Sequence, residues 1–149
     1  MSEIEIIIRL VLALVLGSLI GIERVYAGKN AGIRTMALVS LGAALFVIVS
    51  EYVITAYDYP IDPLRMASNV VTGIGFLGAG MIVFREDHIS NLTTAAGVWV
   101  AAAIGMATGF GMYLVAITVT VLVLITFTFL WRWERLLKKR INKEMHYTK

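Results

Sequence analysis

The chain has 149 residues, of which 59% are hydrophobic and only 15% are charged, and its mean hydropathy is +0.84. Soluble domains usually carry about 25% charged residues, so this composition excludes an ordinary soluble domain. The net charge is +3, and the absence of cysteine excludes disulfides and thiolate metal sites.

Five apolar runs follow one another along the chain. A helix needs ~20 mostly apolar residues to cross the hydrocarbon core of a bilayer, and each run has about that length. The runs are too continuously apolar for the alternating strands of a membrane barrel. The sequence therefore predicts an all-α bundle of five transmembrane helices, at residues 6–22, 35–57, 66–84, 92–108 and 112–131.

The basic residues predict the orientation of these spans. Gly109 and Gly111 supply a tight turn that divides the apolar stretch 93–131 into two spans. With the N-terminus outside, only Arg9 and Arg65 of the thirteen basic residues lie outside, and the other eleven are cytoplasmic. We therefore expect a membrane domain at 1–131 and a basic amphipathic cytoplasmic tail at 132–149, lying on the anionic inner leaflet.

Glycines are concentrated in three of the five predicted spans. Gly73, Gly75 and Gly78 have the spacing of a dinucleotide-binding loop, but that loop must follow a strand and open a helix. Inside an apolar span, small residues instead let helix backbones approach closely. We therefore expect no nucleotide, and a core of spans one, three and four with span three at its centre. Spans two and five are bulkier and are expected to face lipid. The predicted packing glycines are Gly17, Gly21, Gly73, Gly75, Gly78, Gly80, Gly105 and Gly109.

Four sequence blocks carry a family resemblance. They are LGSLIGIER (16–24), AGIRTMALVSLGAAL (31–45), VVTGIGFLGAGMI (70–82) and LTTAAGVWVAAAIGMATGFG (92–111). In this order they resemble the membrane domain of the MgtC/SapB family. The resemblance implies a bacterial inner-membrane protein linked to growth at low magnesium and, in the MgtC branch, to survival in macrophages and restraint of the F-type ATP synthase. MgtC-type members carry a soluble C-terminal domain, which we expect this chain to lack.

Polar residues cluster at the predicted cytoplasmic ends of spans one and two. Glu23, Arg24, Arg34 and Thr35 lie in the two segments GIER and GIRT, which the resemblance marks as family hallmarks. Glu23 is expected to pair with Arg34 or Arg24 and to hold the loop against the bundle. The alternative is that the arginines only set topology at the membrane interface. Glu23 is also the one candidate ligand for a metal, because Mg²⁺ prefers carboxylates and water.

Polar residues also mark the two ends of spans three and four. Arg65 opens span three and is expected to pair with Glu51 at the outer face. Asn69 and Thr72 lie one and two turns deeper, and Asn69 is expected to form an interhelical hydrogen bond. The alternative is a polar vestibule that runs inward from Asp62 and Arg65. Thr93 and Thr94 open span four and are expected to cap it with help from Asn91.

Three classes of function remain open. The first is a non-enzymatic regulator or stress-adaptation factor linked to magnesium homeostasis through other membrane complexes. The second is an oligomeric Mg²⁺ transporter or channel, against which the scarcity of polar residues near the bilayer midplane counts. The third is a lipid-sensing or structural protein. No catalytic constellation is visible, and we expect a homo-oligomer in the lipid bilayer that binds no nucleic acid.

Overall fold

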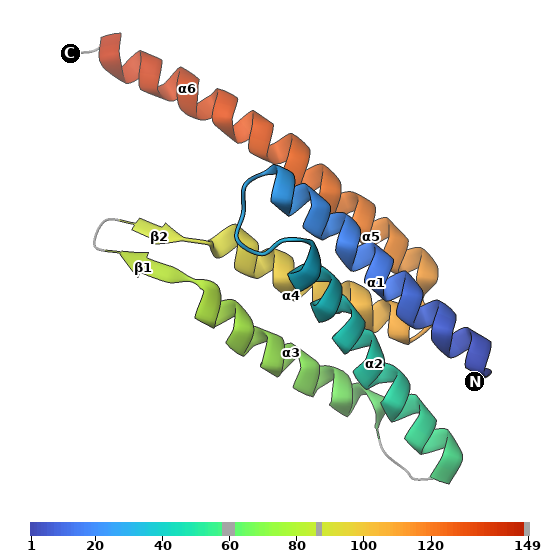
Figure 1. Cartoon of the computed structure of the whole chain (residues 1–149). Helices are drawn as coiled ribbons and strands as arrows, with labels where there is room; N and C mark the ends of the chain where they lie inside the picture. The colour runs from blue at the N-terminus through green and yellow to red at the C-terminus, as the bar shows by residue number, and fades with distance from the viewer. Residues whose placement is uncertain (58–61, 86–87, 148–149) are drawn as a thin grey trace.

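The computed structural model describes residues 1–57, 62–85 and 88–147 of the chain. The helices are α1 (Glu3–Tyr26), α2 (Ile33–Tyr57), α3 (Pro63–Met81), α4 (Leu92–Gly109), α5 (Tyr113–Ile125), the π-helix η1 (Thr126–Leu130) and α6 (Trp131–Tyr147). A two-stranded antiparallel hairpin, β1 (Val83–Arg85) and β2 (His88–Ser90), joins α3 to α4. Figure 1 shows the helices running alongside one another in one elongated bundle.

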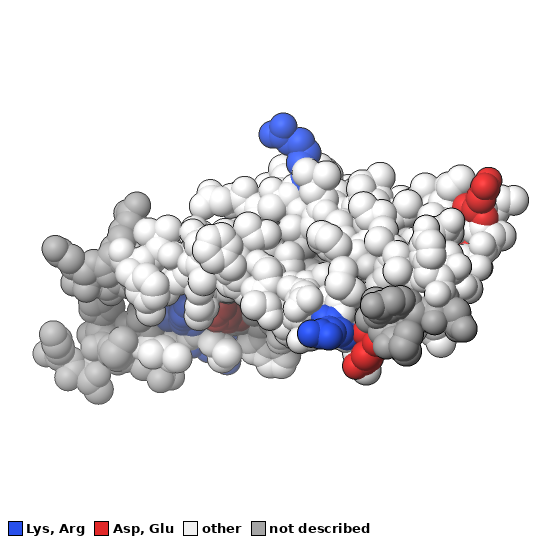
Figure 2. Space-filling model, turned by 90° about the horizontal axis from the view of Figure 1, so that it is seen from below, with Lys and Arg blue, Asp and Glu red and all other residues white. Residues whose placement is uncertain are grey.

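The surface of the bundle is that of a helical membrane protein. Four helical stretches are long and apolar enough to cross a bilayer, namely α1, α2, α4 and the continuous stretch Tyr113–Lys138. Large apolar side chains point outward: Phe76 is 80% exposed and Leu114 is 79% exposed. In Figure 2 most of the visible face is uncharged, and Lys, Arg, Asp and Glu side chains are scattered singly or in small groups among the described residues. Such a surface is favourable in lipid and unfavourable in water. The helix α3 is not among the four stretches, since Arg65, Asn69 and its glycines lower its hydropathy.

Helices α1, α2 and α4 form the core through glycines that admit a neighbouring backbone. A Cβ on Gly17 would lie 2.6 Å from the carbonyl oxygen of Met36 on α2. A Cβ on Gly109 would lie 2.9 Å from the carbonyl oxygen of Ala44, also on α2. Gly21 meets the backbone of α2 in the same way, and so does Gly105. These four of the predicted packing glycines therefore lie at helix crossings, and α2 receives all four contacts.

The prediction that span three is central is wrong for this chain, and α2 occupies the centre instead. In Figure 1, α3 lies at one side of the bundle, with α2 and α4 between it and α1. A Cβ on Gly73, Gly75 or Gly80 would meet no atom within 4 Å, and one on Gly78 would only reach Ala95 at 3.9 Å. The reason is that α3 packs through its branched side chains, which include Val70 and Ile74.

The prediction that span two faces lipid rested on the large side chains of α2 and missed its buried face. Its outward side chains are large, but its inward face carries a stripe of small residues. Ala37, Ser40, Ala43 and Ala44 are all buried there, and Ser40 and Ala44 have no exposed surface. Small residues at helical spacing let two other helices approach one face closely. A count of large residues over the whole span conceals this stripe.

Several helix boundaries differ from the predicted spans, and two of the differences change the local structure. The third helix ends at Met81, and residues 83–85 form β1 where a helix was predicted to continue to residue 84. The helix of the last span continues beyond the predicted end of that span at residue 131, because α5 runs through η1 into α6. In Figure 1 the basic tail extends the line of α5 beyond the rest of the bundle. The predicted turn between spans four and five is confirmed, with Gly111 at φ +75°.

Candidate functional sites at the two ends of the bundle

Arg9 is the buried centre of an ion cluster near the N-terminal end of α1, and its two carboxylate partners are partly exposed. The residue is only 6% exposed. One terminal nitrogen lies 2.5 Å from Glu5 Oε1, and the other lies 2.8 Å from Glu51 Oε2. The second nitrogen also donates a 2.7 Å hydrogen bond to the carbonyl oxygen of Gly109. Since these partners belong to α1, α2 and the end of α4, one guanidinium ties together the three core helices.

The sequence reasoning missed this cluster. It assigned Glu51 to Arg65, whereas the structure pairs Glu51 with Arg9 and leaves Arg65 exposed. The cause is the edge position of α3, which takes Arg65 away from the α1–α2 contact. A signal was present, because Glu5 and Arg9 stand four residues apart at the start of an apolar span.

Arg24 occupies the equivalent position at the other end of α1. Its side chain is buried, and its Nε donates a 2.5 Å hydrogen bond to Glu23 Oε2. The guanidinium carbon lies 3.7 Å from the centre of the Phe127 ring, which is a cation–π contact. Of the two partners predicted for Glu23, the structure therefore forms the pair with Arg24. Arg34 and Thr35 are exposed on α2 and do not join this pair.

A hollow of about 370 Å³ opens beside Arg24. The chain after α1 turns back through Gly28, at φ +65°, and the backbone N–H of Lys29 donates to the carbonyl oxygen of Arg24. This turn brings Lys29 to the rim. The opposite wall is the start of α4, with Thr93 and Thr94. Segments that are far apart in the sequence thus line one small polar space.

The first turn of α4 is not capped as predicted. Asn91 takes a left-handed conformation, φ 66°, and its side chain caps no N–H group of the helix. Instead its amide nitrogen donates to the carbonyl oxygen of Met81, at 3.1 Å, which anchors the hairpin. Thr94 is 2% exposed and lines the hollow, and no hydrogen bond of its hydroxyl is formed among the described residues.

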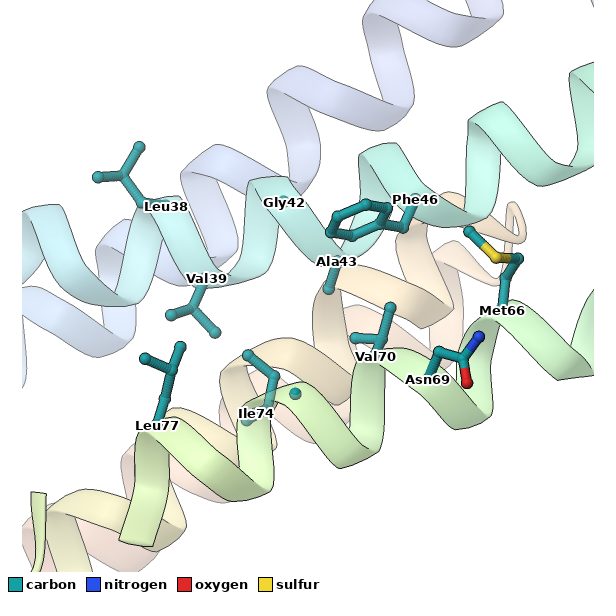
Figure 3. A pocket seen from close by; sticks show the side chains of 11 residues that line it. Leu38, Val39, Gly42, Ala43, Phe46, Met66, Asn69, Val70, Ile74 and Leu77 are labelled. Atoms are coloured by element: carbon teal, nitrogen blue, oxygen red, sulfur yellow. The ribbon is translucent and has the colours of Figure 1, made fainter. Parts of the chain in front are cut away.

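A second hollow, about 530 Å³ in volume, is the apolar groove between α2 and α3. In Figure 3, Val39 and Ala43 on α2 face Val70 and Ile74 on α3, and Asn69 lies at the end near Met66. Asn69 is exposed, and its predicted interhelical hydrogen bond is not formed within the described ranges. The hydroxyl of Thr72 donates back to its own helix, to the carbonyl oxygen of Ser68 at 3.1 Å. The groove is open and mainly apolar, and Asp62, Arg65 and Thr72 are not among its lining residues.

The described residues offer no group of three or more His, Cys, Asp or Glu side chains that would hold a metal ion. Glu23, the predicted candidate, is paired with Arg24 at 2.5 Å. A guanidinium at that distance repels a divalent cation and competes for the carboxylate. The geometry of Glu23 is that of an ion pair.

Comparison with known proteins identifies the family. The family model described as the MgtC family matches residues 10–136, so the chain belongs to this family, and the resemblance is confirmed. "Putative magnesium transporter YhiD" of Escherichia coli K12 is 52% identical over 113 residues, which are 73% of this chain and 53% of that protein. No solved structure matches the chain.

Two further relatives carry the names that define the family. Protein MgtC of Salmonella typhimurium LT2 is 43% identical over 107 residues, covering 72% of this chain and 44% of that protein. Protein SapB of Bacillus subtilis 168 is 38% identical over 116 residues, covering 73% of this chain and 49% of that protein. This chain spans about half the length of these curated relatives.

Proposed function

We propose that this chain is a non-enzymatic regulator or stress-adaptation factor of the bacterial inner membrane, linked to magnesium homeostasis. Membership of the MgtC family supports this proposal, and so does the word magnesium in the name of the relative YhiD. In the proposal α3 crosses the membrane as well, giving five spans with the N-terminus outside. The distribution of basic residues along the sequence supports that orientation.

The observation that favours a regulator over a transporter is the nature of the buried charges. In the described part of the chain, the buried ionisable residues are Arg9 and Arg24, one toward each end of α1. Each is paired with carboxylates of the same chain. Mg²⁺ is bound through oxygen ligands, and transport paths need polar groups near the midplane. Here Ile20, Val98 and other apolar side chains fill the core between the two arginines.

The second candidate is an oligomeric Mg²⁺ transporter. The name of YhiD favours it, and so does the open groove between α2 and α3. Gly42 and Gly73 line that groove, and neither would bring a Cβ within 4 Å of another atom. A homo-oligomer would cover this surface with a second copy and would bring several Asn69 side chains together. Small residues on an open helix face support such an association.

Magnesium flux separates the two candidates. The purified chain is reconstituted into liposomes that contain a magnesium-sensitive dye, and entry is followed with and without a membrane potential. The regulator proposal expects no entry above that of empty liposomes, from protein shown to be folded. Potential-dependent entry that is lost in Asn69→Val and kept in Glu23→Gln would establish transport along the α2–α3 groove instead. If Glu23→Gln also abolished entry, the cytoplasmic end would belong to the path as well.

A further inference from the structure

We propose that the hollow beside Arg24 binds a phosphate group at the predicted cytoplasmic surface of the membrane. Arg24, Lys29, Thr93 and Thr94 supply polar groups to its wall, and apolar side chains that include Phe127, Leu130 and Trp131 form much of the rest. This inference concerns binding and does not depend on whether the chain regulates or transports magnesium.

Arg24 is oriented so that part of its guanidinium remains available. Its Nε is used by Glu23, and one face of its plane lies on Phe127. Its two terminal nitrogens form no hydrogen bond among the described residues, and they are not among the fully buried atoms without a partner, so they keep accessible surface although the side chain as a whole is only 3% exposed. A buried guanidinium needs acceptors for its N–H groups, and phosphate oxygens match its fork of donors. The ion pair and the ring fix the direction of the fork before any ligand arrives.

Phe127 is held under Arg24 by an irregular part of the last helix. It lies in η1, the π-helical turn between α5 and α6, and it is 8% exposed. π-Helical turns are rare and frequently occur at functional sites. The ring also touches Gly97 of α4, where a Cβ would lie 2.9 Å from Cζ of the ring. The same aromatic side chain thus joins α1, α4 and the last helix around the hollow.

The start of α4 supplies a second set of donors. Ala95 donates the first backbone hydrogen bond of the helix, to Asn91, so the N–H groups of residues 92–94 precede the helical ladder. Asn91 provides no side-chain cap. Thr94 is 2% exposed as a residue and lines the hollow, and its hydroxyl forms no hydrogen bond among the described residues. Free N–H groups and the positive end of the helix dipole favour an anion at this position.

The charges around the hollow agree with an anionic ligand. Arg24 is paired with Glu23, and Glu134 on the rim is paired with Lys138 at 2.5 Å. The excess charge of the lining is therefore positive and comes from Lys29. Trp131 completes the rim, as expected at the level of lipid headgroups. The ligand chemistry is a phosphate group, supplied either by a phospholipid headgroup or by soluble phosphate.

The test uses the full chain in maltoside detergent, which contains no phosphate. Inorganic phosphate is titrated in one arm, and phosphatidylglycerol dispersed in the same detergent is titrated in the other. Binding is read from the rise in the thermal unfolding midpoint, since a ligand of the folded state stabilises it. Native mass spectrometry counts bound lipid. A saturable rise in the first arm assigns the site to soluble phosphate, and a rise in the second arm alone assigns it to a headgroup.

Two variants locate the site, and two matched variants serve as controls. Thr94→Val removes the hydroxyl at constant volume. Arg24→Lys keeps the positive charge but removes the forked pair of terminal guanidinium nitrogens. Each is expected to weaken binding about tenfold or more, as loss of a hydrogen bond to a charged group does. Thr118→Val and Arg65→Gln, at exposed positions outside the hollow and outside the basic tail, are expected to bind like the unaltered chain. Absence of binding in both arms, or equal weakening in the controls, would overturn the proposal.

Discussion

Replacing Gly105 with alanine tests the α2–α4 crossing on which the bundle depends. A Cβ at this position would overlap the backbone of Ser40, including its Cα at 2.9 Å. The backbone of α2 can avoid this overlap only if the whole helix moves away from α4. Overpacking of this kind costs about 1–3 kcal/mol, and sometimes more. Alanine offsets roughly 0.5–1 kcal/mol of that cost through its higher helix propensity.

The net expectation for Gly105→Ala is therefore a loss of about 1–2 kcal/mol in the free energy of unfolding. Gly75→Ala is the matched control, because it lies in the middle of α3 and a Cβ there would meet no atom within 4 Å. It should leave stability unchanged or raise it by up to about 1 kcal/mol. Both variants are compared by denaturant titration in mixed micelles. Equal losses, or a larger loss for Gly75→Ala, would refute the assignment of α2 and α4 to the core.

Two further predictions concern the ends of the bundle. Glu51→Gln should cost about 1–3 kcal/mol of unfolding free energy, because it leaves the buried Arg9 with Glu5 as its remaining carboxylate. In the double variant, adding Arg9→Met to Glu51→Gln should restore part of the lost unfolding free energy. If the losses of the two single variants simply add in the same micelle titration, the result would argue against the ion pair. Truncation after Trp133 should preserve the unfolding midpoint but weaken binding to anionic vesicles, since each basic residue near the surface contributes ~1 kcal/mol. Unchanged vesicle binding in a flotation assay would contradict a membrane role for the tail.

The glycine motifs show which features of helix packing a sequence pattern predicts in a membrane protein and which it does not. Gly17 and Gly21, and Gly105 and Gly109, were predicted to bring helices close, and all four lie at crossings with α2. The denser motif at Gly73 and Gly75 gave the stronger signal and yet faces open space. A glycine permits close approach from either side of a helix, but it does not specify which side a neighbour occupies. That choice depends on which face of each partner is also small.

The pairings of the polar residues were also predictable only in part from the sequence. The pairing of Glu23 with an arginine followed from their positions at one helix end, and adjacency on the same turn decided in favour of Arg24. The pairing of Glu51 required knowledge of which helix lies beside α2 at its far end, and the prediction of Arg65 as its partner was wrong because Arg9 of α1 lies there. The hollow beside Arg24 depends on a left-handed turn at Gly28 and a π-helical turn at Phe127. Neither turn has a reliable signal in one sequence.

The sequence by itself determined the class of this protein, because the length and apolarity of its segments leave a helix as the only way to satisfy the backbone in lipid. Its four ordered motif blocks also determined the family. Tertiary structure alone decided that α2 is central, that α3 lies at the edge, and that Arg9 joins three helices. The physical reason is that lipid is as apolar as the side chains, so hydrophobicity does not choose helix partners. Shape and a few buried hydrogen bonds make that choice, and both depend on all the helices together.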